Sequence, residues 1–226
     1  MTDAVSNSSP TAVLFDIDGT LVDSNYLHVE SWAHAFADVG ANDVPAWRIH
    51  RAIGQDSAKL LDSLLGSRAA ELGDRAKELH SQYYKQLADR LRPLDGAQDL
   101  LREVHSRGRT IVLATSAPED ELDILTGILD VDEAIHATTN SDDVETAKPD
   151  PSIVEVALDK AGVSASDAIF VGDSVWDCIA ASRAGVRTVG LLSGGFSSAE
   201  LLSAGAIAIY DDPAALLREL SLSPLA

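Results

Sequence analysis

Short apolar runs alternate with longer segments of helical periodicity along most of this chain of 226 residues. The apolar runs are rich in β-branched residues, as expected of strands in a sheet that is covered on both faces. They are Ala12–Phe15, Thr110–Ala114, a run near Ala134–Ala137, Ala168–Val171, Arg187–Leu191 and Ala206–Tyr210. Amphipathic helices are expected between the later runs. This alternation predicts an α/β fold with a Rossmann-like, mostly parallel sheet flanked by helices.

The segment between the first and second predicted strands has a different pattern, because it is almost purely helical. Leucines recur at helical spacing within 60–65, and apolar residues do so again within 72–87. The segment therefore predicts a bundle of about four helices. Its aromatic residues Tyr26, Trp32 and Trp47 are expected to pack between these helices.

The position of this helical segment predicts the domain organisation. Residues 11–22 and 92–226 would form the sheet and its helices as a catalytic core, after a flexible tail of residues 1–10. Residues 23–91 would form an inserted helical-bundle cap after the first strand. Because the insertion leaves the carboxyl end of that strand, it would lie over the edge of the sheet where ligands bind in α/β folds.

Charge and cysteine content restrict the classes of function. The 36 acidic and 17 basic residues give a net charge of −19, which repels nucleic acid and anionic lipid, so neither is expected as a partner. The single cysteine, Cys178, excludes an internal disulfide and fits a reducing compartment. Residues 1–10 lack the pattern of a signal peptide, and no stretch is long and apolar enough to span a bilayer. We therefore expect a cytoplasmic protein.

Two acidic residues, Asp16 and Asp18, directly follow the first predicted strand, and Gly19 allows the chain to turn after them. In an extended chain their side chains point the same way. Two carboxylates about 4 Å apart repel each other by about 1 kcal/mol in water and about 4 kcal/mol at a protein-like dielectric constant. Either a cation lies between them or one is protonated, and both arrangements suit catalysis. An ordinary strand-end turn is the alternative that this pair alone leaves open.

Further polar residues follow other predicted strands. Thr115 follows the second strand, Lys148 lies in a later connection, and Asp173 ends another strand with Asp177 one helical turn beyond it. Because the carboxyl ends of parallel strands share one edge of a sheet, these side chains should converge near Asp16. Oxygen-rich acidic sites suit Mg²⁺, and a hydroxyl and an ammonium group can bind phosphoryl oxygens. The sequence therefore predicts a Mg²⁺ site beside a phosphate site.

Four motifs carry a resemblance to a known family. They read DIDGTLVDS at 16–24, LATS at 113–116, AKPDP at 147–151 and VGDSVWD at 171–177. In this order, and with a helical insertion after the first strand, they resemble the haloacid dehalogenase superfamily of phosphotransferases, and most closely its phosphoglycolate-phosphatase-like branch. The resemblance covers nearly all of residues 12–210. It implies a Mg²⁺-dependent phosphatase that hydrolyses a small phosphorylated metabolite of the phosphoglycolate or sugar phosphate type.

The same resemblance implies roles for the site residues. Asp16 would be the nucleophile that forms an aspartyl-phosphate, and Asp18 would be the general acid and base. Mg²⁺ would be held by the Asp16 carboxylate, the backbone carbonyl of Asp18, and Asp173. The other implied residues bind phosphate or support the site: Thr115, Ser116 and Lys148 for phosphate, and Thr20, Ser174 and Asp177 as supports.

Departures from neighbouring branches favour hydrolysis. The dehalogenase and phosphonate-hydrolysing branches lack the second acid, which is present here as Asp18. A sugar phosphomutase of the β-phosphoglucomutase type is the main alternative, although that branch usually has Glu-Asp at Gly172-Asp173 and a glycine at Asp177. A phospho-aspartate receiver domain is a further alternative, but receivers lack a large helical lid. A silent binding protein fits poorly with the complete set of acids.

Substrate choice is expected to lie in the helical cap. His28, Arg51, Gln55 and Lys59 are candidate contacts near the cleft. Arg51 or Lys59 could supply positive charge for a second anionic group of the substrate.

Overall fold

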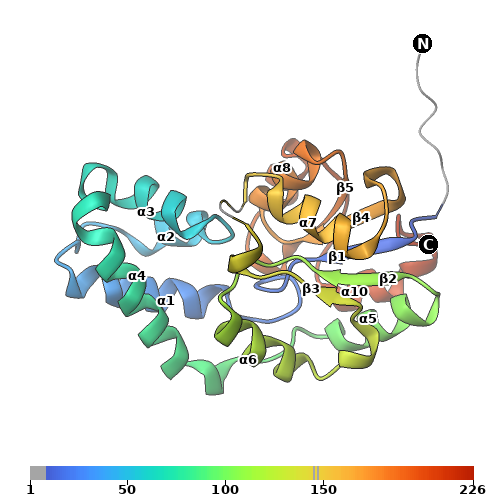
Figure 1. Ribbon diagram of the computed structural model, residues 1–226, viewed down its shortest axis with the longest axis horizontal. Helices are drawn as coiled ribbons and strands as arrows, with labels where there is room; N and C mark the ends of the chain where they lie inside the picture. The colour runs from blue at the N-terminus through green and yellow to red at the C-terminus, as the bar shows by residue number, and fades with distance from the viewer. Residues whose placement is uncertain (1–8, 145, 147) are drawn as a thin grey trace, which may run out of the picture.

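A six-stranded parallel sheet lies at the centre of the computed structural model, which describes residues 9–144, 146 and 148–226 (Figure 1). The strands are β1 (Ala12–Phe15), β2 (Thr110–Leu113), β3 (Ala137–Thr138), β4 (Ala168–Gly172), β5 (Arg187–Leu191) and β6 (Ala206–Tyr210). Their order is β3-β2-β1-β4-β5-β6, and each neighbouring pair is parallel. The predicted α/β fold with a mostly parallel sheet is confirmed. β1 lies between β2 and β4, so residues that follow it are flanked by two other strand ends.

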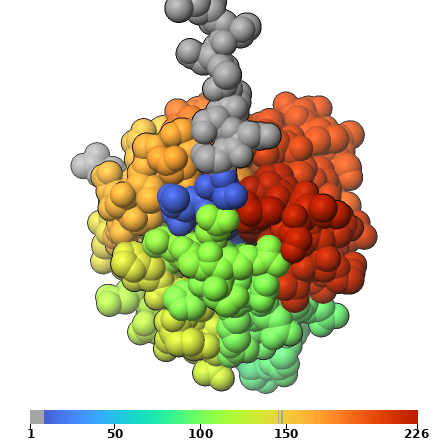
Figure 2. Space-filling model, turned by 90° about the vertical axis from the view of Figure 1, so that its right-hand side faces the viewer, coloured from blue at the N-terminus to red at the C-terminus, as the bar shows by residue number. Residues whose placement is uncertain are grey.

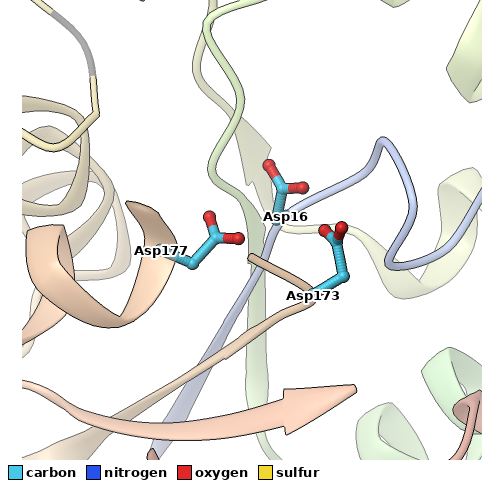
Figure 3. A group of neighbouring side chains, drawn as sticks. All are labelled: Asp16, Asp173 and Asp177. Carbon is cyan, nitrogen blue, oxygen red and sulfur yellow. The ribbon is translucent and has the colours of Figure 1, made fainter. Parts of the chain in front are cut away.

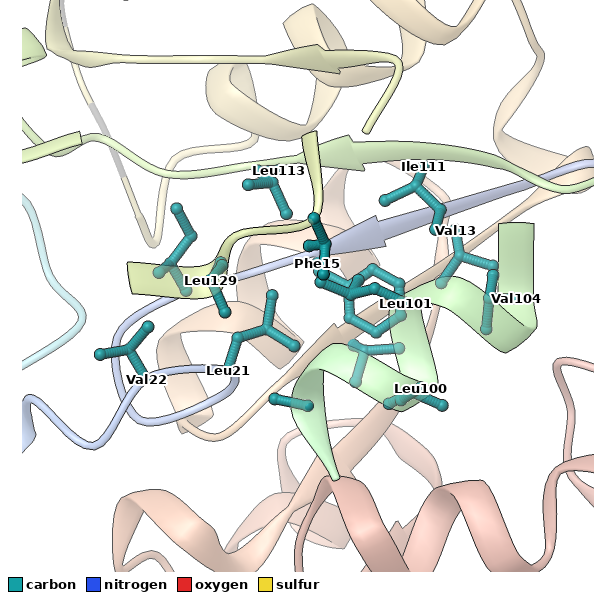
Figure 4. Packing of buried hydrophobic residues seen from close by; sticks show 14 of the residues in the cluster. Val13, Phe15, Leu21, Val22, Leu100, Leu101, Val104, Ile111, Leu113 and Leu129 are labelled. Atoms are coloured by element: carbon teal, nitrogen blue, oxygen red, sulfur yellow. The ribbon is translucent and has the colours of Figure 1, made fainter. Parts of the chain in front are cut away.

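The alternation of side chains along β1 divides the core between the two faces of the sheet. Val13 and Phe15 pack into one cluster with Leu100 and Leu101, as Figure 4 shows. The helices that cover this face are α5 (Ala97–Ser106), α6 (Glu119–Leu129) and α10 (Pro213–Arg218). This face of β1 is therefore closed to water.

Ala12 and Leu14 of β1 face a second apolar cluster on the other side of the sheet. The helices that contribute side chains to this cluster are α7 (Ser152–Ala161) and α8 (Val175–Arg183). Next to α8, the short helix α9 (Ser198–Ser203) packs with Cys178 and Phe196. Cys178 is fully buried there, as expected of a packing residue.

Four helices follow β1 and pack around an apolar cluster of their own. They are α1 (Asn25–Asp38), α2 (Ala46–Ala52), α3 (Ser57–Leu65) and α4 (Ala69–Gln86). Trp32 is buried in this cluster, but Tyr26 and Trp47 are 60% and 68% exposed, so the packing prediction is wrong for these two residues. Only Ile49 and Ala52 of α2 are buried, and Trp47 lies on the other side of that short helix.

The helical segment joins the sheet through two chain passages that lie side by side. Val22 and Pro93 form an isolated antiparallel bridge, the Asp23 N–H donates to the Arg92 carbonyl (2.9 Å), and the Leu94 N–H donates to the Leu21 carbonyl (2.8 Å). In Figure 1 the four helices stand to one side of the sheet, next to the carboxyl end of β1. Figure 2 shows the opposite side of the molecule, where the first described residues lie between the α5 segment and the C-terminal segment.

Some details differ from the sequence prediction or lie outside the described residues. The third strand is shorter and later than expected, since Asp132–Ala134 form a 3₁₀ turn before Ala137–Thr138. Most of the predicted tail, 1–10, and Ala147 of the AKPDP motif lie outside the described residues, while Pro10 is buried. In the described part of the chain, no helix has the length and apolar character that crossing a membrane requires.

Candidate active site

Three buried carboxylates gather where β1 and β4 end. Asp16 follows β1, Asp173 follows β4, and Asp177 lies in the first turn of α8 (Figure 3). One carboxylate oxygen from each lies within 4.8 Å of the other two, and none of the residues is more than 7% exposed. The register explains their proximity, because Phe15 pairs with Val171 and the Asp16 N–H donates to the Val171 carbonyl (3.0 Å).

Lys148 is the ammonium group that accompanies these acids. Its Nζ lies 2.5 Å from Asp16 Oδ1 and 2.7 Å from Asp177 Oδ1, and the residue is 3% exposed. Burial alone would lower the pKa of Lys148, but Asp16 and Asp177 raise it above its usual value. Lys148 therefore stays charged and offsets one of the three negative charges.

Burial and the neighbouring negative charges both raise the pKa values of two of these acids. Burial raises the pKa of Asp16 to about 7 although Lys148 opposes the shift, and burial together with Asp177 and Asp16 raises the pKa of Asp173 well above its ordinary value. A divalent cation would relieve this repulsion, and carboxylate oxygens are the ligands that Mg²⁺ takes. The charge and chemistry of this donor set therefore fit a metal ion.

Neighbouring side chains hold the acids in place. Asp173 accepts hydrogen bonds from Thr20 Oγ1 (2.9 Å) and from Asn25 Nδ2 (2.9 Å). Asp177 Oδ2 accepts from the Ser174 hydroxyl (2.6 Å) and the Ser174 N–H (3.0 Å), and this reciprocal cap begins α8. Thr20 and Ser174 are thus positioned to orient acids, and Asn25 is a third such residue that the sequence reasoning did not identify.

Two glycines leave the space that Asp173 occupies. A Cβ atom built on Gly194 would lie 1.7 Å from Asp173 Oδ2, and one on Gly19 would lie 2.6 Å from the same atom. Gly19 also has a φ of +75°, which disfavours other residues. The loops after β1 and β5 can approach the carboxylate only because both positions lack a side chain.

Asp18 has different partners from the acidic cluster. Its Oδ1 accepts from Ser24 Oγ (2.5 Å) and from His28 Nε2 (3.3 Å), and His28 Nδ1 lies 3.0 Å from His80 Nε2. Burial alone would raise the pKa of Asp18, but the hydrogen bond and charge of His28 and the Ser24 hydroxyl lower it below the usual range. Burial and His28 lower the pKa of His80 well below its ordinary value, so His80 is neutral and its Nε2 accepts a hydrogen bond from His28 Nδ1.

A cavity of about 320 Å³ opens between the sheet edge and helices α1–α4. Five side chains predicted for the site line it: Asp16, Asp18, Thr115, Ser116 and Lys148. Thr115 is buried at the end of β2, where its Oγ1 accepts from the Ala117 N–H (3.1 Å). The parallel sheet thus brings the predicted nucleophile, the second acid and the predicted phosphate-binding residues to one cavity.

The two cationic cap residues expected at the substrate have other surroundings. Arg51 forms an ion pair with Glu200 and its guanidinium carbon lies 3.9 Å from the centre of the Phe196 ring. Neither Arg51 nor Lys59 lines the cavity. The physical reason for Arg51 is the direction of α2, whose last turn faces the loop after β5 instead of the strand ends.

Other residues of the helical segment do reach the cavity. His28 and Gln55 line it as expected, whereas Trp32, His80 and Glu121 were not identified as site residues from the sequence. An aromatic residue or a histidine at helical spacing gives the same pattern whether it packs in a core or faces a ligand. Only the packing of α1 and α4 against the sheet edge separates the two cases.

Comparison with known proteins agrees with this geometry. The family model for haloacid dehalogenase-like hydrolases matches residues 13–191, which is more than half of the chain. The Phosphoglycolate phosphatase of Rhodospirillum rubrum is 31% identical, with 92% of this chain and 89% of the relative covered. The Pyrophosphatase PpaX of Bacillus velezensis is 26% identical, with 80% and 82% covered.

Solved structures add a further similarity. The crystal structure of a hydrolase from Pseudomonas syringae has a TM-score of 0.87 and 38% sequence identity, and the match covers 94% of this chain and 98% of that one. The chain belongs to the haloacid dehalogenase-like hydrolase family. The predictions of this family, of its phosphoglycolate-phosphatase-like branch and of a phosphatase-type hydrolase are thereby confirmed.

Proposed function

We propose that this protein is a Mg²⁺-dependent phosphomonoesterase that acts on a small phosphorylated metabolite through an aspartyl-phosphate at Asp16. One observation carries the proposal: the carboxylates of Asp16, Asp173 and Asp177 lie within 4.8 Å of one another, and Lys148 contacts two of them. The cavity beside them is lined by Asp18 and Thr115. A nucleophile, a second acid and cationic phosphate ligands are what phosphoryl transfer to a carboxylate needs.

The proposed reaction has two steps. A carboxylate oxygen of Asp16 attacks phosphorus, the bond from phosphorus to the leaving oxygen breaks, and Asp18 protonates that oxygen. Asp18 then takes a proton from water, the water oxygen attacks phosphorus, and phosphate leaves with Asp16 regenerated. The pKa of Asp18 is lowered in the free protein, so the carboxylate is ionised, as a group that accepts a proton must be. The negative charge of a bound phosphate raises that pKa and so favours the protonated acid for the first step.

Other residues would bind the phosphoryl oxygens and the metal ion. Lys148 and Thr115, with Ser116, would donate hydrogen bonds to the phosphoryl group. Mg²⁺ would be held by Asp16 and Asp173 with the backbone carbonyl of Asp18, and Asp177 would support it. The metal ion would supply charge that stabilises the phosphoryl oxygens during transfer.

Residues 23–91 would act as a cap on a core of residues 11–22 and 92–226. The separate apolar cluster of the helical segment supports this division. Two hydrogen bonds join the parts: the Asp56 N–H donates to the Lys148 carbonyl (2.9 Å), and His50 Nε2 donates to the Gly194 carbonyl (2.8 Å). A cap in this position would exclude water from the cavity while the ester reacts.

The substrate would be a small phosphorylated molecule, since the named relatives are a phosphoglycolate phosphatase and a pyrophosphatase. Hydrolysis is favoured over phosphomutase activity because the relative that matches 92% of the chain is a phosphatase. We also propose a cytoplasmic location and no nucleic acid or membrane partner, as the net charge of −19 and the single cysteine suggest.

The experiment is a screen of phosphorylated metabolites for released phosphate, with and without Mg²⁺. Asp16→Asn should abolish turnover, whereas Asp62→Asn, the same change at an exposed residue of α3, should leave it unchanged. Rapid acid quenching should trap phosphate on Asp16 in the wild-type protein. Near-normal turnover by Asp16→Asn, or full activity in EDTA, would refute the proposal, and an isomerised product without free phosphate would indicate a mutase.

A further inference from the structure

Glu121 is a buried acid in the cavity that the proposed reaction does not use. It lies in the first turn of α6, is 5% exposed and lines the cavity together with Asp18 and His28. Its side-chain partner is the Ser81 hydroxyl of α4, which donates to Oε1 (3.2 Å). A carboxylate offers about four acceptor positions, so Glu121 has capacity left for a ligand in the cavity.

The charged groups around Glu121 leave a net negative environment. Lys85 of α4 forms its ion pair with Asp120, next to Glu121 in α6. Of the cationic groups that line the cavity, Lys148 contacts Asp16 and Asp177, and the imidazole of His28 contacts Asp18. Lys77 of α4 also lines the cavity, but it is an exposed residue at the surface. His28 lies close enough to act on Glu121, but the acids Asp16, Asp18 and Glu121 in the cavity wall outnumber the cationic groups Lys148 and His28. A second anionic group deep in the cavity would therefore meet net negative charge.

Apolar side chains also line the cavity. Ala117 and Pro118 precede α6, and Trp32 and Leu60 come from the helical segment. Such a wall favours an uncharged part of a ligand, which a hydrogen bond to Glu121 would orient. A buried acceptor discriminates strongly against ligands that fail to donate a hydrogen bond to it.

We propose that Glu121 determines specificity by accepting a hydrogen bond from a hydroxyl or amino group of the leaving group and by disfavouring esters with a second anionic group. The inference rests on the proposed phosphatase function and narrows its substrate class. That class is the monophosphate of a polyol, sugar or amino alcohol. Phosphoglycolate and pyrophosphate, which carry a second anion, fall outside it.

The test compares kcat/KM for matched esters with Mg²⁺ present. Glycerol 3-phosphate and a hexose 6-phosphate supply hydroxyl donors, phosphoethanolamine supplies an amino donor, and propyl phosphate supplies neither. Phosphoglycolate and pyrophosphate supply the second anion. The wild-type protein should prefer the donor-bearing esters over the anionic ones by about tenfold or more. Comparing kcat/KM for glycerol 3-phosphate and phosphoethanolamine then shows whether Glu121 accepts from a hydroxyl group or from an amino group.

Glu121→Gln should lower kcat/KM for donor-bearing esters by about tenfold, because the neutral amide oxygen accepts a weaker hydrogen bond than the carboxylate does. The same variant should raise kcat/KM for phosphoglycolate, since the repulsion is removed. Glu119→Gln makes the same change at an exposed residue two positions away on α6 and should alter neither value. Glu121→Asp keeps the negative charge on a shorter side chain. It should therefore lower kcat/KM for the donor-bearing esters, while kcat/KM for the anionic substrates stays low.

Two results would overturn the inference. One is a wild-type preference for phosphoglycolate or pyrophosphate. The other is a Glu121→Gln protein that has the Tm of the wild type and also the same ratio of kcat/KM between donor-bearing and anionic substrates. In both cases the phosphatase proposal stands, because phosphate is still released. If the wild-type protein releases phosphate from no ester and traps none on Asp16, the phosphatase proposal fails and this inference fails with it.

Discussion

The imidazole of His28 donates a hydrogen bond from Nε2 to Asp18 Oδ1 at 3.3 Å, across the boundary between α1 and the loop after β1. The same ring stacks on Tyr84 of α4, with the ring centres 4.0 Å apart. Two helices of the predicted cap therefore hold the side chain that orients the second acid of the site. The position of helices α1 and α4 and the direction of the Asp18 carboxylate are therefore physically linked.

Replacing His28 by alanine should impair the chemical steps more than substrate binding. Without the imidazole, Asp18 loses the partner that directs its carboxylate, so we expect kcat to fall by about 10- to 100-fold with a smaller change in KM. Steady-state kinetics on the best ester of the screen provides the measurement. His34→Ala, at an exposed position of the same helix, should retain kcat, and an equal loss in both variants would count against the positioning role.

The stability that His28 provides should depend on pH. Burial alone would lower the pKa of His28, but its hydrogen bond to Asp18 and the charge of Asp18 raise it above the unfolded value of 6.5. A raised pKa contributes stability that is fully present below pH 6.5 and is lost as pH rises through the folded value. The Tm difference between wild type and His28→Ala should therefore be larger at pH 6 than at pH 9. Thermal melts at both values test this, and a difference that grows with pH would contradict it.

Mg²⁺ should stabilise the protein through Asp173. Binding to the folded state alone raises Tm as the ion is added. Burial, together with the neighbouring acids, raises the pKa values of Asp16 and Asp173, and a bound cation would offset this cost of their charged forms. Asp173→Asn should lose this Mg²⁺-dependent shift. Its Tm without metal should be at least as high as that of the wild type, because one uncompensated buried charge is gone.

Melting curves with Mg²⁺ and with EDTA provide the measurement. Asp62→Asn, on the surface of α3, should behave like the wild type in both. A full Mg²⁺ shift in Asp173→Asn would mean that the ion binds elsewhere.

A methyl group at Gly194 should disrupt the site by contact alone. The added Cβ would lie 1.7 Å from Asp173 Oδ2, so the carboxylate or the loop after β5 must move. We expect a loss of phosphatase activity of about 100-fold or more, together with a weaker Mg²⁺ shift in Tm. Gly194→Ala should still fold, since its position is outside the sheet.

The matched control is Gly127→Ala in α6, where a Cβ would meet no atom within 4 Å. It should keep full activity and gain about 0.5–1 kcal/mol of stability, because alanine is the better helix former. Activity assays and denaturant unfolding on the two variants separate the contact at Gly194 from the general effect of replacing glycine. Equal behaviour of both variants would contradict the steric account.

The convergence of the acids could be predicted from the sequence because it depends on a local rule. Asp16 and Asp173 each follow an apolar strand, and neighbouring parallel strands end at the same edge, so their proximity follows once both strands are identified. Strand period and helix caps are likewise local properties of a few residues. For this reason the bounds of β1, β5 and β6 agree with the sequence prediction.

The surroundings of the leaving group were decided by tertiary structure alone. Trp47 and Trp32 have similar sequence signals, yet one is 68% exposed and the other lines the cavity. Arg51 forms an ion pair with Glu200, whereas Glu121, which the sequence did not indicate as a site residue, lines the cavity together with Asp18. These outcomes depend on how α1–α4 pack against the sheet edge. That packing is determined by the sum of many weak contacts between residues distant in sequence. No local pattern encodes that sum, so the sequence determined where the proposed reacting groups lie, and the packing determined what surrounds them.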